Sequence, residues 1–161
     1  MLSLTSRSPL ACVYVVSFAM LHRVAVVLCA SHAVGIADLG PWFQAACQGD
    51  LSELQKRLNA GQAVDQASDS GHTAFLYAVS HGRHAAAELL LSQGANPAVA
   101  TKGGNTALHL VSDLGGDWRM IKLLIEYGAP LRSRNQPYRS TPYDVARIAQ
   151  DPAAAALLNA G

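Results

Sequence analysis

The feature that most constrains the fold is an internal repeat of about 33 residues. The segment 71–78 (GHTAFLYA) returns as 104–111 (GNTALHLV) and, in shorter form, as 140–146 (STPYDVA). A second marker, a Leu- or Ile-rich stretch that ends in glycine, follows with the same period, with its glycines at positions 61, 94 and 128. Because two independent markers keep step, we expect a row of similar structural units.

Each unit is predicted to be a pair of helices joined by a turn. Thr73, Thr106 and Thr141 precede helical patterns, where a threonine hydroxyl can accept a hydrogen bond from a backbone N–H of the first turn. Glycines at 82 and at 115–116 separate the two helices, and those at 61, 94 and 128 stand where a helix end needs a left-handed residue. The second helices carry apolar residues at three- and four-residue spacing: Ala86, Leu89, Leu90, Ile121, Leu124 and Ile125.

The repeated pattern resembles the ankyrin repeat, in which Gly-x-Thr-Pro-Leu-His-x-Ala-Ala is followed by a glycine turn, a leucine-rich helix and Gly-Ala-Asp-x-Asn. The resemblance covers about residues 39–161 and is strongest in the two middle units. It implies an all-α ankyrin-repeat solenoid of about four stacked helix-turn-helix units with short hairpin loops. The four units are expected at about 39–69, 70–102, 103–137 and 138–161.

The sequence departs from the ankyrin pattern at several signature positions. Alanines 74 and 107 replace the usual proline, and Leu76 and Asp144 replace the usual histidine. His109 keeps that histidine, and the resemblance implies that it forms interior hydrogen bonds between adjacent hairpin loops. Because one unit cannot bury its apolar stripe alone, each is expected to stack on its neighbours, and the end units are expected to carry polar outer faces.

Residues 1–37 have the composition of a targeting segment. A single membrane span over the apolar runs 9–21 and 24–37 would place Arg23 near the bilayer centre, which is costly. Starting at Met20, a short positive leader, an apolar core and small residues before Asp38 give the layout of a secretory signal peptide. We therefore expect residues 1–37 to be a signal peptide or an N-terminal membrane segment, with Met20 as a possible true start. A buried N-terminal helix is a third interpretation.

The domain at 38–161 is accordingly expected in the periplasm or outside the cell, or, if the first segment is not cleaved, anchored to a membrane. The formal net charge of +1 provides no global basic field, so no nucleic-acid partner is expected. Charge is nevertheless uneven, since residues 38–69 hold five acids against Lys56 and Arg57. Near the other end, four arginines are opposed only by Asp144: Arg132, Arg134, Arg139 and Arg147.

Residues that could carry chemistry have simpler explanations. His81 and His84 have a spacing that sometimes binds metal, but they straddle a glycine turn, so we interpret them, with His72, as solvated loop residues. Cys47 lies among alanines, as a small core residue would. Asp113 and Asp117 flank the glycine pair and are expected to form a solvated turn. With no nucleophile, phosphate-loop or zinc-protease motif, we expect no metal, no cofactor and no catalysis. An enzyme using the histidines or Cys47 is the alternative.

The resemblance implies that a partner protein binds the hairpin tips and the exposed side of the first helices. Trp42 is expected to close the N-terminal end of the core, whereas Trp118 is expected to be partly exposed and to anchor a partner. The third hairpin, with Gln136 beside Tyr138 and its arginines, is the best candidate for an arginine-and-aromatic contact. We expect a monomeric, non-catalytic protein-binding module. The other contact residues are expected to be Asp69, Ser70, His72, Ser80, His81, Lys102, Asn105, Asp113, Leu114, Tyr138 and Arg139.

Overall fold

The computed structural model describes residues 40–160, and the predicted signal peptide or membrane segment at 1–37 lies outside the described residues. Within 40–160 every regular element is an α-helix. None of these helices is long and apolar enough to cross a membrane. The helices are α3 (Pro41–Gln48), α4 (Leu51–Asn59), α5 (Ala74–Ser80), α6 (His84–Ser92), α7 (Ala107–Asp113), α8 (Trp118–Glu126), α9 (Pro142–Ile148) and α10 (Pro152–Ala160).

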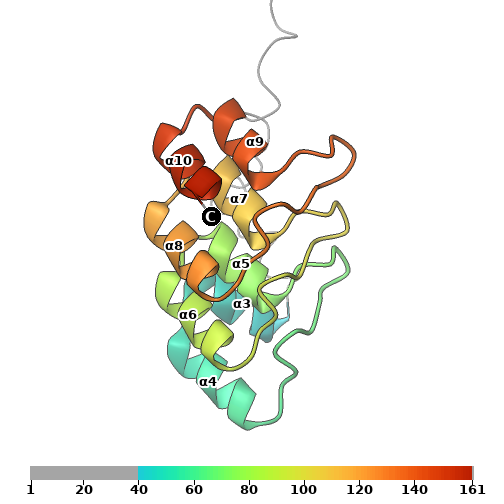
Figure 1. Ribbon diagram of the computed structural model, residues 1–161. Helices are drawn as coiled ribbons and strands as arrows, with labels where there is room; N and C mark the ends of the chain where they lie inside the picture. The colour runs from blue at the N-terminus through green and yellow to red at the C-terminus, as the bar shows by residue number, and fades with distance from the viewer. Residues whose placement is uncertain (1–39, 161) are drawn as a thin grey trace, which may run out of the picture.

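The helices form four consecutive pairs that stack in a row (Figure 1). The first helices of the pairs pack in order, α3 on α5, α5 on α7 and α7 on α9. The second helices α4, α6, α8 and α10 form another layer, and long hairpin loops extend from one side of the stack (Figure 1). The predicted all-α solenoid of helix-turn-helix units is therefore confirmed.

Polar side chains and glycines set the ends of the helices where the sequence predicted them. The hydroxyl of Thr73 accepts a hydrogen bond from the Leu76 N–H at 3.3 Å, and the hydroxyl of Thr141 accepts one from the Asp144 N–H at 3.3 Å. Asp50 caps α4 in the same way. The glycines that follow the second helices have left-handed backbones, with φ of 88°, 88° and 78° at Gly61, Gly94 and Gly128.

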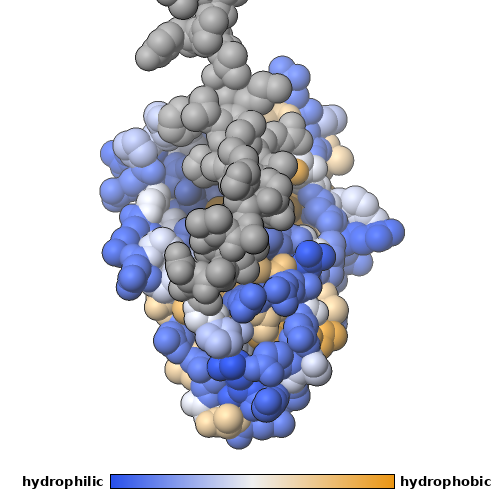
Figure 2. Space-filling model, turned by 180° about the vertical axis from the view of Figure 1, so that it is seen from behind, coloured by the Kyte–Doolittle hydropathy of each residue, from blue (hydrophilic) through white to orange (hydrophobic). Residues whose placement is uncertain are grey.

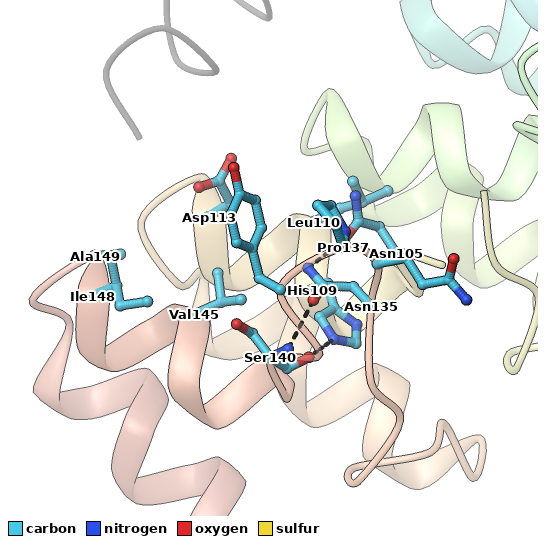
Figure 3. Close-up of a pocket in the computed structure, with 12 residues that line it drawn as sticks. Asn105, His109, Leu110, Asp113, Asn135, Pro137, Ser140, Val145, Ile148 and Ala149 are labelled. Atoms are coloured by element: carbon cyan, nitrogen blue, oxygen red, sulfur yellow. Dashed lines mark hydrogen bonds between the residues drawn. The ribbon is translucent and has the colours of Figure 1, made fainter. Parts of the chain in front are cut away.

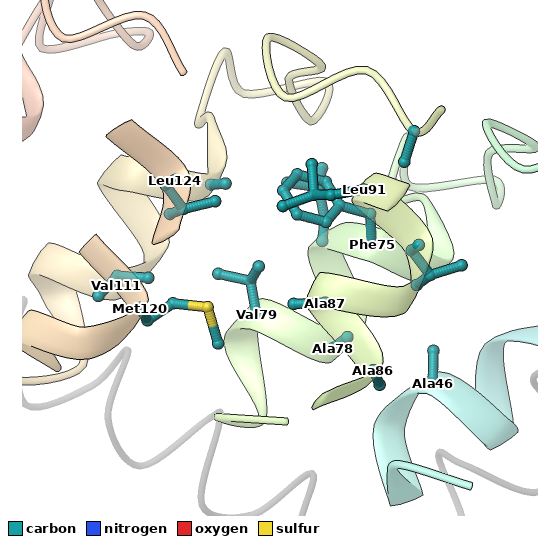
Figure 4. Close-up of a cluster of buried hydrophobic side chains, with 14 of the residues drawn as sticks. Ala46, Phe75, Ala78, Val79, Ala86, Ala87, Leu91, Val111, Met120 and Leu124 are labelled. Atoms are coloured by element: carbon teal, nitrogen blue, oxygen red, sulfur yellow. The ribbon is translucent and has the colours of Figure 1, made fainter. Parts of the chain in front are cut away.

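A single apolar core runs through the stack, between the two layers of helices. Figure 4 shows Val79 of α5, Val111 of α7 and Met120 and Leu124 of α8 within one cluster. Small side chains such as Ala78 allow the helices to approach closely. The predicted stripes face this core: Ala86, Leu90, Ile121 and Leu124 are buried, while Leu89 and Ile125 are half-buried at its edge.

Two residues of α3 behave as the sequence predicted. Trp42, at the N-terminal end of the stack, is only 3% exposed and belongs to the core cluster. Cys47 is also buried. Its carbonyl oxygen accepts a hydrogen bond from Nε of Arg83 at 3.0 Å, so the first unit is tied to the second at the turns between helices.

His84 and Asp117 form a second tie between units, whereas the sequence predicted only solvated turn residues at both positions. Nε2 of His84, at the start of α6, lies 2.8 Å from a carboxylate oxygen of Asp117. The other carboxylate oxygen of Asp117 accepts a hydrogen bond from the Arg119 N–H at 3.1 Å and caps α8. Asp117 therefore has a double structural role, which sequence analysis missed because its two partners belong to different units.

The hairpins also touch one another, and a glycine makes this possible. Gly71 has φ of 80°, and a Cβ atom at this position would lie 2.9 Å from the backbone nitrogen of Lys102 in the next hairpin. That Lys102 N–H points to the carbonyl oxygen of Ser70 at 3.4 Å. The first two hairpins can therefore pack backbone to backbone only because residue 71 lacks a side chain.

We expect Gly71→Ala to lower the free energy of unfolding by about 2–4 kcal/mol, because it adds an overpacking cost to the cost of a left-handed alanine. Gly94→Ala is the matched control, since Gly94 has φ of 88° but a Cβ atom added there would meet nothing within 4 Å. It should cost only about 1–2 kcal/mol. Urea unfolding followed by circular dichroism measures both values, and equal losses would contradict the close approach of the hairpins.

Candidate functional site

A groove with a volume of about 640 Å³ lies between α7, α9 and the third hairpin, residues 127–141. Side chains from both helices border it, as Figure 3 shows. Three of its apolar residues come from α9 and the residue after it, where positions 145, 148 and 149 share one helical face. The groove is lined by Asn105, His109, Leu110, Asp113, Asn135, Gln136, Pro137, Tyr138, Ser140, Val145, Ile148 and Ala149.

His109 forms the floor of this groove and joins the third unit to the fourth. It is 1% exposed, and its Nε2 lies 2.9 Å from the carbonyl oxygen of Ser140. Because a carbonyl can only accept, Nε2 carries the proton and donates it. Nδ1 then accepts a hydrogen bond from the Thr106 N–H at 3.3 Å. Burial lowers the pKa of His109, which keeps the ring neutral. The predicted interior hydrogen bond between units is confirmed.

Asn135, at the base of the third hairpin, holds that hairpin against the second. Its Oδ1 accepts a hydrogen bond from the Ser140 N–H at 2.9 Å, and its Nδ2 donates to Oδ1 of Asn105 at 2.9 Å. The N–H of the next residue, Gln136, donates to the carbonyl oxygen of Gly103 at 2.8 Å. Asn105, predicted as a contact residue, therefore also has a structural role, because it holds the side chain of Asn135.

The third hairpin is one residue longer than the first two. The Ser68 N–H donates to the carbonyl of His72, four residues on, whereas the Asn135 N–H donates to the carbonyl of Ser140, five residues on. Arg139 stands two residues before its threonine, as Gly71 does, and keeps a left-handed φ of 54°. The longer tip leaves Tyr138 65% exposed and Arg139 exposed.

The repeat and its geometry agree with comparison to known families. A family model described as ankyrin repeats, in three copies, matches residues 42–158. The chain belongs to the ankyrin-repeat family. Ankyrin repeats typically serve as protein–protein interaction modules, so the groove beside the third hairpin is a candidate contact surface.

Three relatives illustrate how much of a protein this similarity covers. The chain is 33% identical to ankyrin repeat family A protein 2 of Mus musculus over 72 residues, which are 45% of this chain and 23% of that protein. It is 34% identical over 102 residues to ankyrin repeat protein nuc-2 of Neurospora crassa, covering 63% and 10%. With protein PhlB of Serratia liquefaciens it shares 30% identity over 106 residues, covering 66% and 46%. The chain thus spans less than half the length of each.

Of the predicted contact residues, the ankyrin stack brings Asn105, Asp113 and Tyr138 together in the groove. Arg139 lies in an adjoining hollow on the same hairpin. Leu114, at the end of α7, is half-buried and does not line the groove.

The contact residues predicted in the second unit lie outside this groove. Asp69 and Ser70 are exposed at the first hairpin tip. His72 stacks on the ring of Tyr77, with 5.1 Å between ring centroids, and burial lowers its pKa. Ser80 and His81 are both half-buried at the end of α5, and each lies within hydrogen-bond distance of the carbonyl oxygen of Tyr77. Lys102, also outside the groove, is exposed at the second hairpin tip.

Trp118 lies on a different side of the molecule. It is the first residue of α8, in the second layer of helices, and is 54% exposed. The guanidinium carbon of Arg119 lies 5.3 Å from the centroid of its ring system. Its predicted exposure is therefore confirmed, but it does not line the groove.

Sequence reasoning missed the apolar lining of the groove. Leu110 and Val145 each stand four residues after a capping threonine, the position that Tyr77 holds in the second unit. All three are half-buried, on the open side of the first helices. Comparing residues at equal distance from the threonines could have found this row. On the face that Figure 2 shows from behind, hydrophobic residues lie among hydrophilic ones.

The described residues also bear on the chemistry considered for the histidines and Cys47. Within 40–160 no group of three or more His, Cys, Asp or Glu side chains is placed to hold a metal ion.

Asp144, at the signature histidine position, accepts hydrogen bonds from the N–H and hydroxyl of Thr141 at 3.0 and 2.7 Å. The Thr141 N–H is the main cause of the lowered pKa of Asp144. That carboxylate thus closes a capping box at the start of α9.

We expect His109 to make stability depend on pH. Its lowered folded pKa means that, below about pH 6.5, the unfolded chain takes up a proton before the folded chain does. Stability should be full above that pH, decrease as the pH falls through the folded pKa, and level off below it. His109→Gln should cost about 1–3 kcal/mol at neutral pH and flatten the decrease.

Urea titrations between about pH 7.5 and 4.5 measure this effect. His72→Gln is the comparison variant. Burial lowers the pKa of His72 as well, but its ring makes no bond between units in the described residues, so this variant should cost less stability at neutral pH than His109→Gln. An equal decrease in the wild type and in His109→Gln would show that His109 does not titrate as proposed.

Arg139 provides a test of backbone strain at the hairpin tip. We expect Arg139→Gly to raise the free energy of unfolding by about 1 kcal/mol, because glycine adopts the left-handed φ of 54° without a steric cost. Arg134→Gly, on the same hairpin but with an ordinary φ, is the control and should not stabilise the protein. A loss of stability on Arg139→Gly would contradict this account of the tip.

Proposed function

We propose that this protein is a non-catalytic protein–protein interaction module that binds its partner through the hairpin tips and the open side of the first helices. The observation that carries the proposal is the groove of about 640 Å³ with two large exposed side chains on its border, Ile148 at 66% and Tyr138 at 65%. Exposed apolar residues that are gathered beside polar ones are typical of interaction sites.

The physical properties of the groove support such a role. Tyrosine is enriched among the residues that dominate binding energy, since it offers a large rigid surface with few torsions to fix. The floor is already ordered by His109 and Asn135, whose hydrogen bonds join neighbouring units. A partner would therefore meet a preformed surface and lose little affinity to ordering the hairpin.

The location is a second part of the proposal. The signal-peptide layout of residues 1–37 supports a secreted or periplasmic protein, and the domain that follows is expected to be a monomer. A membrane-anchored form, with the N-terminal segment retained, is the alternative. The intact mass of the protein in its own compartment distinguishes them, because cleavage after Ala37 removes the whole segment.

We expect a combined Tyr138→Ala and Ile148→Ala substitution to weaken partner binding at least about tenfold, because it truncates both apolar anchors. Cross-linking with mass spectrometry identifies the partner and the contact residues, and titration of that partner gives the affinity. Lys56→Ala on α4, far along the chain and 80% exposed at its side chain, is the control and should bind normally. Unchanged binding by the double variant would exclude the groove.

A further inference from the structure

A second hollow, of about 570 Å³, adjoins the groove on the third hairpin. Its lining includes Arg134 and Arg139, and it shares the wall formed by residues 135–137 with the groove. One hollow is thus mainly apolar and the other basic, with three residues between them. Because an extended chain advances about 3.3 Å per residue, a short peptide crossing this wall can reach both.

The positive charge around this wall is only partly balanced by the protein. Four arginines on the hairpin and α9 are exposed, and none of them takes part in an ion pair among the described residues 40–160. The hydrogen bonds from Thr141 lower the pKa of Asp144, and the charges of Arg147 and Arg134 lower it further. Asp144, whose carboxylate accepts hydrogen bonds from Thr141, is the only acid among residues 132–147, so the arginines remain in excess. The four are Arg132, Arg134, Arg139 and Arg147.

We propose that the two hollows together bind an extended acidic segment of a partner protein that contains one apolar residue. The apolar residue would lie in the groove against Leu110, Val145 and Ile148, while carboxylates beside it would pair with Arg134 and Arg139. This inference rests on the proposed function and adds the chemistry of the partner. Arginine suits the role because its guanidinium can form two parallel hydrogen bonds with one carboxylate.

Charge argues against two other occupants. The chain's own residues 1–39 contain Arg7 and Arg23 but only Asp38 as an acid, so the basic hollow would not attract them. A second copy of this chain would have to place its acidic first unit against the basic hollow. Two of the acids there are occupied: Glu53 pairs with Arg57 at 2.7 Å, and Asp65 accepts a hydrogen bond from the Asn96 N–H at 3.1 Å. Acidic residues of a partner segment fit the basic hollow better, and an apolar residue of the same segment fits the groove.

The test uses the full chain and fluorescein-labelled decapeptides, with binding followed by fluorescence anisotropy. The probe has a central leucine flanked by Asp and Glu, and three matched peptides carry Ser and Asn flanks, Lys and Arg flanks, or serine in place of leucine. We expect the acidic leucine peptide to bind at least about tenfold more tightly than each of the others, and salt to weaken its binding.

Variants then locate the site. Arg134→Glu with Arg139→Glu should weaken the acidic peptide at least about tenfold, since it reverses the charge of the basic hollow. Lys56→Glu with Lys122→Glu changes the net charge equally but lies on α4 and α8, and should leave affinity within about twofold. Ile148→Ser should remove the preference for leucine over serine. Thermal melts verify folding, and Arg134→Gln with Arg139→Asn replaces the charge-reversed variant if that one does not fold.

Several results would overturn this inference. Equal affinity for the peptide with Ser and Asn flanks, or unchanged affinity of the acidic peptide for the Arg134→Glu, Arg139→Glu variant, would contradict an acidic partner segment. Tighter binding of a decauridine RNA or of a peptide of residues 1–37, lost in the same variant, would assign the hollows to a different occupant, as would self-association that this variant abolishes. If a protein still cross-links to the groove while acidic peptides do not bind, only this inference fails. If no protein cross-links there, the proposed function fails as well.

Discussion

Burial of apolar side chains between neighbouring units is the interaction on which the rest of this structure depends. The described helices are only 7–9 residues long, and isolated helices of that length are not stable in water. The helix α5 persists because Phe75, Leu76 and Val79 are at most 2% exposed between α3 and α7. Stability in such a stack is approximately a sum over units and their shared interfaces, so the groove exists only where two units meet.

One position of the repeat shows how different side chains meet the same local need. Three residues after the capping threonine stand Leu76, His109 and Asp144 in successive units. Leucine adds apolar burial, with an exposed fraction of 0%. Histidine bonds to its own Thr106 and reaches across to Ser140, whereas aspartate only turns back to its own threonine. A side-chain tie between units therefore lies under the third hairpin, and it fixes the base of the hairpin whose tip exposes Tyr138 and Arg139.

Much of this fold could be predicted from the sequence because its determinants are local and repeated. Capping threonines, turn glycines and apolar stripes all act within about 35 residues and in the same register. Contacts between units were harder to predict. The His84–Asp117 pair and the bond from Arg83 to the Cys47 carbonyl depend on how one turn is rotated against the next, which residue spacing does not determine. Spacing from the threonines points to Val145, but it does not reveal that Val145 forms one hollow with Ile148 and Asp113.

The contact surface lies where the constraints of stacking are weakest. At Gly71 two constraints act together, since the backbone is left-handed and the next hairpin leaves no room for a side chain. At Arg139 only the first remains, because no further hairpin packs on this tip among the described residues. An arginine there costs about 1 kcal/mol of strain but places a charge in the hollow that adjoins the apolar groove. Side chains such as Tyr138 and Arg139 can therefore stand exposed at the third hairpin without disturbing the core that holds the units together.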